Sequence, residues 1–599
     1  MPQAPPSLTD CPTVALDVET NGLRWWDRDR PIGIAIGLPD GPMHYLPWGH
    51  RGGGNLDENV IKRWARRELR GKHIVNLNTR FDLHMLYAWG IDLEKQNCSV
   101  SDISHSAALL DDSRQRFSLD RLAQDYVGQE KTGKDLDARQ MADYPASRVA
   151  PRAESDVRQV LALRDVFAPK LQAENLERVQ ALEDQVIWVV CEMERNGSPI
   201  DTDLLDQWIT ESEQAYLRGL WKIWRATDLQ INPTASTDLE RLFSHLKLPI
   251  SHTPDGRPSF TDAVLTQHHD HPVITLLRKT RKISSLRSKY LLKYRDGICS
   301  DGVMRYALHQ CRAQSGGGTA GTVTGRFSST AIDRGVGINI QQVLSASKQR
   351  AAFDTDYLIR RLHRPASGLW LSADAAQIEY RLFAAEAKNP RVLKSYAADP
   401  GASFHRMMWE QLQKLKPDLS YKATKNLNFC KLYGGGAIKI ATMLDYITAE
   451  DAVALRAENA KWNHPTLAPT RQVLDLYARV LPEVGPMLTR TAMIAERQGY
   501  VSTILGRRAR LTSHFYKALN RMIQGSAADI MKLKLVALHR ARNATGLRLR
   551  ATVHDEVVGD IPDRDGAERV GAVLNAQSVD LPVPILWDVA TGDTWGACD

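Results

Sequence analysis

The sequence lacks paired cysteines and long apolar runs. Its seven cysteines include no CxxC pair, and none stands at a zinc-binding spacing from histidine. Scattered free thiols fit a reducing compartment such as the cytoplasm. No stretch approaches the roughly eighteen consecutive apolar residues of a membrane span, and the first ten residues carry neither a basic start nor an apolar run. We therefore expect neither membrane insertion nor secretion.

Charge and length give only broad limits. The formal net charge is +8 and the pI is near 9.0, a mild basic excess that does not by itself identify a nucleic-acid-binding protein. The chain has 599 residues, of which 43% are apolar, and one core rarely serves more than about 300 residues. The sequence therefore predicts a globular protein of several domains.

Positive charge is concentrated between residues 278 and 295, where eight Lys or Arg residues occur without any Asp or Glu. Apolar residues recur at helical spacing in the same stretch: Leu276, Ile283, Leu286 and Tyr290. A helix could pack on the protein with this face and offer its basic side to phosphate groups. A solvated basic surface without a ligand is the alternative. The candidate phosphate contacts are Lys282, Arg287 and Lys289.

Four acidic residues in the first third of the chain fit a site for two divalent cations. Residues 13–20, TVALDVET, predict a buried strand on which Asp17 and Glu19 share one face. Asp82 falls in the first turn of a helix that follows a strand at 73–78, and Asp156 opens a later helical pattern. Several carboxylates are needed to hold two cations about 4 Å apart. Any one acidic pair would be weak support, because 25% of all residues are charged.

Residues 421–436, YKATKNLNFCKLYGGG, place Lys425, Phe429 and Tyr433 four residues apart, on one face of a helix. Such a face suits a nucleoside triphosphate, with the ammonium at the phosphates and an aromatic ring against the sugar and base. Taken alone, the segment is equally typical of an amphipathic helix with an aromatic core stripe.

Two carboxylates on either side of that helix complete the pattern. Residues 369–382, LWLSADAAQIEYRL, begin as a strand carrying Asp374 and become helical near Gln377. Residues 547–561 alternate apolar and polar positions and predict a hairpin with Asp555 at its tip. Asp374 and Asp555 could therefore hold two Mg²⁺ jointly, although HDE alone could be a surface turn.

Together and in this order, these motifs resemble those of family A DNA polymerases, the group of bacterial DNA polymerase I and many phage replicases. DVET, NTRFD and Asp156 resemble the three motifs of the DEDD 3′ to 5′ exonuclease domain. Residues 369–382 resemble the family's motif A. The KxxxFxxxYG pattern that begins at Lys425 resembles its fingers helix, and HDE at 554–556 resembles its motif C. TGRFSS with INIQQ resembles the segment that contacts the minor groove near the primer end, and TGDTW resembles the family's terminal GxxW. The resemblance covers nearly the whole chain.

The resemblance implies a role for each matched residue. The exonuclease metal ligands would be Asp17, Glu19, Asp82 and Asp156. The polymerase metal ligands would be Asp374, Asp555 and the backbone carbonyl of Ala375, with Lys425 as a catalytic triphosphate contact. The other nucleotide contacts would be Glu379 (beneath the sugar), Gln377, Lys422, Phe429, Tyr433 and His554. The primer-template contacts would be Arg326, Gln341, Asn520 and Gln524, with Lys282, Arg287 and Lys289 on the thumb.

Four features depart from the family pattern. Ala375 stands where the family has a tyrosine, which matters little if only its backbone carbonyl meets the metal. Arg152 stands four residues before Asp156, where the family has a tyrosine that orients the attacking water, so we expect slow excision unless another residue such as Tyr144 supplies a phenol. Tyr421 stands where the family has an arginine four residues before Lys425, so Lys422 could make the second triphosphate contact. The glycine-rich loop at 315–321 is longer than the family's and receives no role.

The implied architecture is a ribonuclease H-like α/β exonuclease domain followed by a right-hand α+β polymerase. Its expected divisions are exonuclease 1–185, thumb 186–310, palm 311–390 and 520–599, and fingers 391–519. The expected cofactor is Mg²⁺, two ions in each site, with Mn²⁺ as a substitute. The expected ligands are primer-template DNA and deoxynucleoside triphosphates, and no segment resembles the family's 5′ nuclease domain. We expect a cytoplasmic monomer without a membrane partner, in a bacterial host if the gene is a phage's, and a helicase, primase or clamp as possible partners.

Four alternatives stay open at this point. The exonuclease domain could be weak or only bind DNA. A single-subunit RNA polymerase shares the palm, although Glu379 under the sugar and an attached exonuclease favour deoxynucleotides. A nuclease with an inert polymerase-like module is disfavoured because Asp374, Lys425 and Asp555 are all present. A non-enzymatic DNA-binding protein would need neither set of carboxylates.

Overall fold

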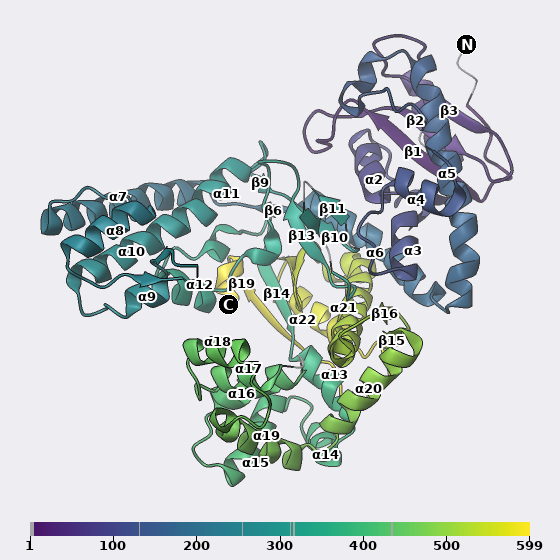
Figure 1. Ribbon diagram of the computed structural model, residues 1–599. Helices are drawn as coiled ribbons and strands as arrows, with labels where there is room; N and C mark the ends of the chain where they lie inside the picture. Colours follow the sequence, from purple (N-terminus) through teal and green to yellow (C-terminus); the bar gives the residue numbers. More distant parts are fainter. Residues whose placement is uncertain are drawn as a thin grey trace.

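The computed structural model describes residues 5–130, 132–253, 255–311, 313–315, 318–320, 322–432 and 435–599. An amino-terminal α/β unit lies at the upper right of Figure 1, a helical arm extends to the left, and a second helical group lies below a central sheet. No helix in these ranges is long and apolar enough to cross a membrane.

The amino-terminal unit is built on a five-stranded sheet of order β3-β2-β1-β4-β5. Its strands are β1 (Thr13–Thr20), β2 (Pro31–Gly37), β3 (Met43–Pro47), β4 (His73–Asn76) and β5 (Ser99–Asp102). The first three strands pair antiparallel, whereas β1, β4 and β5 run parallel. The expected strand at 13–20 is therefore confirmed with the same bounds.

Helices cover both faces of this sheet, and the strand residues alternate between them. The helices are α1 (Glu58–Glu68), α2 (Thr79–Ala88), α3 (Ile103–Leu110), α4 (Leu119–Val127) and α5 (Ala146–Ala173), with a 3₁₀ turn at Ala138–Asp143. Val14, Leu16 and Val18 pack in one core with α1 and α2, whereas Ala15 belongs to the core that includes α5. Asp17 and Glu19 therefore lie on the face that α5 crosses.

The expectation that Asp156 opens a helix is wrong, because α5 begins ten residues earlier at Ala146. The helix continues through Pro151, which lacks a backbone donor. Val149, Ala153 and Val157 are fully buried at four-residue spacing, and this apolar stripe holds the helix on the sheet across the proline.

A long helix, α6 (Glu177–Asn196), joins the amino-terminal unit to the rest of the chain and packs on both. It ends at Gly197, whose φ is +48° and where a β-carbon would crowd Met304 and Val303. The chain then forms β6 (Ser198–Pro199) and enters α7 (Thr202–Thr227), capped by Asp201.

The helical arm contains α7, α8 (Ser236–His245), α9 (Asp262–Thr266), α10 (Pro272–Leu286) and α11 (Leu292–Gly297), with a small hairpin of β7 (Ser251–His252) and β8 (Pro258–Ser259). The basic stretch is not one regular helix, because a π-helical turn at Arg287–Leu291 separates α10 from α11. Of the expected apolar face, Leu286 is fully buried, and Leu276, Ile283 and Tyr290 are half-buried.

The central sheet has the order β17-β18-β14-β19, and every neighbouring pair is antiparallel. Its strands are β14 (Leu369–Ala375), β17 (Arg548–Val553), β18 (Glu556–Ile561) and β19 (Trp587–Gly592). Helices α13 (Ile378–Ala387), α21 (Ala518–Thr545) and α22 (Arg564–Asn575) pack around it. Short elements link it to the arm: β9 (Val303–Met304), β10 (Tyr306–His309), β11 (Ala313–Ser315), β12 (Gly318–Ala320), β13 (Ser328–Ala331) and α12 (Ala346–Phe353).

The lower helical group runs from α14 to α20 (Figure 1). Its helices are α14 (Pro390–Ala398), α15 (Phe404–Leu415), α16 (Tyr421–Leu432), α17 (Ala437–Met443), α18 (Ala449–Ala457), α19 (Ala468–Val480) and α20 (Val484–Gln498). A hairpin of β15 (Tyr500–Ser502) and β16 (Arg508–Arg510) follows and packs on α21. The group therefore connects to the sheet through α13 at one end and α21 at the other.

Candidate functional sites

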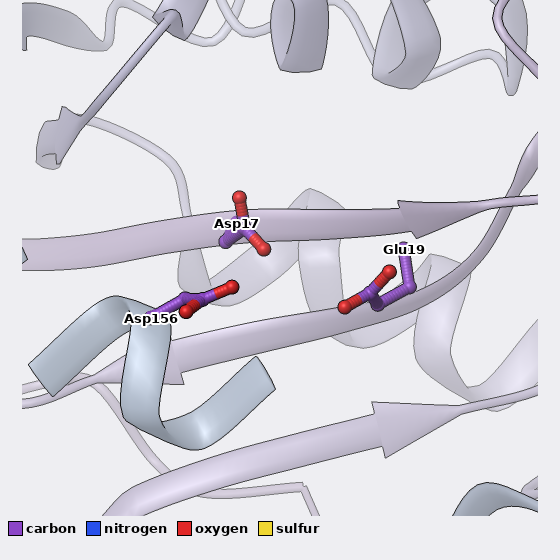
Figure 2. Close-up of side chains that lie close together, drawn as sticks. All are labelled: Asp17, Glu19 and Asp156. Carbon is purple, nitrogen blue, oxygen red and sulfur yellow. The ribbon is translucent and has the colours of Figure 1, made fainter. Parts of the chain in front are cut away.

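Three carboxylates meet between β1 and α5. Asp17 and Glu19 come from the strand and Asp156 from the helix, and one oxygen of each lies within 4.8 Å of the others (Figure 2). Burial and the nearby Asp82, Glu19 and Asp156 charges raise the pKa of Asp17 well above its usual range. Three carboxylates this close repel one another, and hard divalent cations such as Mg²⁺ or Mn²⁺ bind such oxygen donors. The residues therefore fit a metal site.

Asp82 lies beside this group but is not one of the three. It is buried in the first turn of α2, where Oδ1 accepts from the Val18 backbone at 3.0 Å and Oδ2 accepts from Asn76 at 2.7 Å. Its charge still raises the pKa of Asp17, so the two carboxylates are electrostatically coupled. Direct metal binding by Asp82 stays a prediction.

Arg152 occupies the position of the missing tyrosine. Its Nε lies 3.8 Å from Glu19 Oε1 and 4.0 Å from Asp156 Oδ2, and its side chain is largely buried. The guanidinium therefore partly offsets the negative charge of the group and limits the rise in the pKa of Asp17. The Tyr144 hydroxyl accepts from the Asp137 backbone at 3.2 Å, and its ring lies under the Arg148 guanidinium.

The second pair of carboxylates meets at one end of the central sheet. Asp374 ends β14, Asp555 lies in the turn between β17 and β18, and the Ala375 backbone donates to the Asp555 carbonyl at 3.0 Å. His554 has a φ of +59° in this turn, the left-handed conformation of a tight hairpin. The sheet register therefore fixes Asp374 and Asp555 next to each other.

Electrostatics in this site favour a bound cation. Asp374 reaches solvent, but surrounding protein atoms and the Asp555, Glu556 and Asp588 charges raise its pKa to about 7. Burial also raises the pKa of Asp555, against the opposing effect of Arg326. Both carboxylates line a cavity of about 370 Å³, which also contacts Gln341, His554 and Lys348. The open cavity and the two carboxylates fit divalent cations.

Arg326 connects two of the predicted site residues. It contacts the Glu379 carboxylate and lies 3.3 Å from Asp555 Oδ1. Glu379 is buried in the first turn of α13, directly after the motif A strand. Gln341 donates to the Thr552 carbonyl at 3.4 Å, and Gln377 donates to Ser403 at 3.0 Å.

The fingers helix α16 reaches the motif A helix through an aromatic contact. The Phe429 and Tyr380 ring centroids lie 5.2 Å apart at an interplanar angle of 82°. Lys425 and Lys422 are exposed on α16, and Lys422 lines a different hollow from the one that contains Asp374. Tyr433 lies outside the described residues.

The remaining predicted DNA contacts lie on α21 and the arm. Asn520 and Gln524 are half-buried, four residues apart on α21. Lys282 is half-buried and Lys289 exposed on the arm. Arg287 turns into the arm instead, where it contacts the Ile209 carbonyl and Ser212 Oγ. These site roles all stay predictions.

Comparison with protein families decides the identity of the chain. Residues 203–597 match the family model described as DNA polymerase family A. The chain belongs to this family. Residues 5–172 match a 3′-5′ exonuclease model, so the enzyme is a DNA polymerase with an amino-terminal exonuclease domain. The predicted family, fold class and enzyme class are confirmed, whereas the division into thumb, palm and fingers at the stated boundaries stays a prediction.

Relatives of this polymerase include phage enzymes. It is 27% identical to DNA polymerase DpoZ of Salmonella phage PMBT28, over 99% of this chain and 98% of the relative. It is 26% identical to DNA polymerase DpoZ of Acinetobacter phage SH-Ab 15497, over 94% and 93%. The fold is similar to the POL domain of Pol1 from M. smegmatis, solved in complex with DNA primer-template and dNTP. That similarity has a TM-score of 0.74 at 22% identity and covers 98% of this chain and 95% of the other.

Sequence reasoning missed a buried ionic cluster between the polymerase domain and α6. Glu183 contacts Lys532 and Arg507, and Arg507 also pairs with Asp529 at 2.8 Å. Burial alone would raise the pKa of Glu183, but the two cations hold it well below its usual range. No local pattern could have revealed the cluster, because its members are up to 349 residues apart.

Glu556 was also missed, although it stands next to Asp555 in HDE. Its carboxylate accepts from Arg360, from Ser372 at 2.6 Å and from Trp595 at 2.8 Å. These bonds occupy the side chain inside the palm, and Trp595 is the tryptophan of the terminal TGDTW motif. The adjacent acidic residues Asp555 and Glu556 were the feature of the sequence that could have pointed to it.

Proposed function

We propose that the polymerase adds deoxynucleotides to a primer 3′ end as directed by a template, at the site that Asp374 and Asp555 form. The observation that carries the proposal is the register that puts these carboxylates together, with the Ala375 backbone bonded to the Asp555 carbonyl at 3.0 Å. Asp374, Asp555 and the Ala375 carbonyl would hold two Mg²⁺. When bound, these ions lower the pKa of the primer hydroxyl and neutralise the triphosphate as pyrophosphate leaves.

The chain's own side chains would position the substrates. Lys425 projects from the exposed face of α16 and would bind the triphosphate, while Phe429 would lie against the incoming nucleotide. Glu379 would fill the space that a 2′ hydroxyl needs. Arg326 and Gln341 would contact minor-groove acceptors that all correct base pairs share, and so sense pairing without reading sequence. Asn520, Gln524, His554 and Gln377 would complete the contacts to DNA and nucleotide.

We propose a second activity, metal-dependent excision of 3′ ends, at Asp17, Glu19 and Asp156. The approach of these carboxylates to within 4.8 Å supports it, and Asp82 adds a coupled charge. Mg²⁺ bound there would activate a water and support the leaving oxygen, and Mn²⁺ could substitute. Excision is expected to be slow, because the Arg152 guanidinium repels the cations that the carboxylates would hold.

The biological role that fits best is replication of a phage genome in a bacterial cytoplasm, which the phage relatives support. A monomeric state and a helicase, primase or clamp as partners stay predictions.

One experiment tests both activities. Labelled primers with a paired 3′ end, for extension, and with a mispaired 3′ end, for excision, are incubated on a defined template with Mg²⁺ and with dNTPs, rNTPs or no nucleotide. The proposal expects extension with dNTPs, much less with rNTPs, and shortening without nucleotide that Asp17→Ala removes. Extension with rNTPs alone would support an RNA polymerase, and failure in every mixture would leave a DNA-binding protein.

A further inference from the structure

Two buried residues of the exonuclease domain, Tyr45 and His50, form a hydrogen-bonded pair beside the carboxylate group. The Tyr45 hydroxyl lies 2.7 Å from His50 Nε2, and the two side chains are 6% and 3% exposed. Neither belongs to the motifs that the resemblance assigned. This pair stands on the sheet face that α5 crosses, which is also the face of Asp17 and Glu19.

The strand register places the phenol next to Glu19. Asp17, Ala35 and Tyr45 form one row across β1, β2 and β3, and Glu19 and Gly33 are partners in the next row. The Tyr45 hydroxyl occupies the space that a β-carbon at Gly33 would take. Because directly opposite β-carbons lie about 5 Å apart, the phenol oxygen is about that far from the Glu19 β-carbon. Burial raises the pKa of Tyr45, and the Glu19 and Asp17 charges raise it further, in keeping with this proximity.

The hydrogen-bond chain fixes which atom carries each proton. His50 Nδ1 lies 3.0 Å from the Tyr144 carbonyl, which can only accept, so Nδ1 carries the hydrogen. Burial lowers the pKa of His50, against backbone hydrogen bonds to Tyr144 and Met141, so the ring is neutral and Nε2 accepts a hydrogen bond from the Tyr45 hydroxyl. The phenol oxygen is then left with lone pairs only. It faces a carboxylate, which also only accepts.

Two acceptors that face each other require a group with donors between them. Arg152 Nε lies 3.8 Å from Glu19 Oε1, beyond hydrogen-bond distance, whereas a water molecule supplies two donors and can bridge both oxygens. We propose that Tyr45, held by His50, positions the attacking water of the exonuclease reaction against Glu19. It thereby takes over the work of the tyrosine that Arg152 replaces. This inference rests on the proposed exonuclease site.

The reaction balances with the groups present. The water oxygen bonds to phosphorus while the bond from phosphorus to the 3′ oxygen of the preceding nucleotide breaks. One water proton passes to Glu19, and the leaving oxygen takes a proton from solvent, so a nucleoside monophosphate is released. Tyr45 and His50 undergo no net change, since they only orient the water. Tyr45 is therefore a positioning residue.

The first test is Tyr45→Phe, which keeps the ring over Gly33 and removes only the hydroxyl. Tyr126→Phe is the matched control, because Tyr126 packs against Phe167 elsewhere in the same domain. Excision without dNTPs should fall at least about tenfold in Tyr45→Phe. Single-strand affinity in EDTA and primer extension should not change, and the melting temperature should fall by only a few degrees, because the buried His50 Nε2 loses its donor. Excision within twofold of wild type, or a loss explained by weaker DNA binding, would overturn the proposal.

Two further measurements separate this role from simple packing. In an Arg152→Tyr background a second phenol is present, so Tyr45→Phe should reduce the excision rate much less than it does in the wild-type background. An equal reduction in the two backgrounds would contradict the proposal. A metal-free crystal structure should show an ordered water between the Tyr45 hydroxyl and Glu19 that Tyr45→Phe lacks, and a direct bond between the two side chains would contradict it.

Asp17→Ala reports on the underlying site. If it excises at the wild-type rate, the proposed exonuclease site itself fails, whereas a dead Asp17→Ala with a fully active Tyr45→Phe defeats only the role of Tyr45.

Discussion

Arg326 lies 3.3 Å from the Asp555 carboxylate, although 229 residues separate the two in the chain. The same guanidinium contacts Glu379, so one cation links a proposed metal ligand to the residue proposed beneath the sugar. Its planar fork can serve both carboxylates at once, whereas a lysine would act as a single point charge.

Arg326→Lys should therefore slow nucleotide addition even though the charge is kept. We expect kcat/KM for a single dNTP to fall about thirtyfold, which corresponds to about 2 kcal/mol of transition-state stabilisation. The measurement is pre-steady-state incorporation on a fixed primer-template. Arg334→Lys serves as the control, because Arg334 is an exposed arginine on a nearby loop. Equal rates for Arg326→Lys and the control would show that the bridging geometry is unimportant.

Glu379→Ala should increase the use of ribonucleotides. The side chain is buried at the start of α13, so its removal opens space where a 2′ hydroxyl could fit. The ratio of kcat/KM for rNTP to that for dNTP should rise at least about tenfold, or about 1.4 kcal/mol. Steady-state kinetics with matched nucleotides measure it. A constant ratio would place the sugar discrimination at another residue.

Arg152→Tyr should accelerate excision. The guanidinium, at 3.8 Å from Glu19 and 4.0 Å from Asp156, competes with cations for the carboxylates, and the substitution removes it while adding a phenol. Release of the labelled 3′ nucleotide from a mispaired primer should be several-fold faster, and half-maximal activity should need less Mg²⁺. A slower variant would mean that Arg152 contributes more by binding the DNA phosphate than it costs by repelling cations.

Thermal stability should decrease above neutral pH through His539. This histidine of α21 contacts Glu192 and lies 2.8 Å from Glu94 of the exonuclease domain. Burial alone would lower its pKa, but the two carboxylates raise it above 6.5. The stabilising contribution is thus complete below the unfolded pKa of about 6.5 and is lost as pH rises through the folded value.

His539→Gln provides the comparison, since it keeps a polar side chain without a titrating proton. The melting temperature of wild type should exceed that of the variant most at pH 6, and the difference should shrink by pH 9. A difference that stays constant with pH would show that His539 does not carry charge in the folded protein.

Much of both sites could be predicted because their residues lie within short periodic segments. Asp17 and Glu19 are two apart on a strand, and Asp555 is at a hairpin tip, so local pattern alone determines where they point. The start of α5 was misplaced because the helix runs back through Pro151 to Ala146, which tertiary packing tolerates and local periodicity does not show.

Contacts between distant segments could not be predicted. Arg326 with Glu379, Glu183 with Arg507 and Tyr45 beside Glu19 each depend on how whole elements pack. Tyr45 reaches Glu19 only because Gly33, on the strand between them, has no side chain.

The most direct test of the polymerase site is primer extension by Asp555→Asn and Asp374→Asn alongside wild type, with duplex binding measured on the same samples. Each substitution removes one carboxylate charge from a site that would hold divalent cations, while the basic DNA-binding surface is untouched. We predict loss of nucleotide addition by at least about a thousandfold, with duplex affinity within a few-fold of wild type. Extension at a near wild-type rate by either variant would contradict the assignment of these two aspartates.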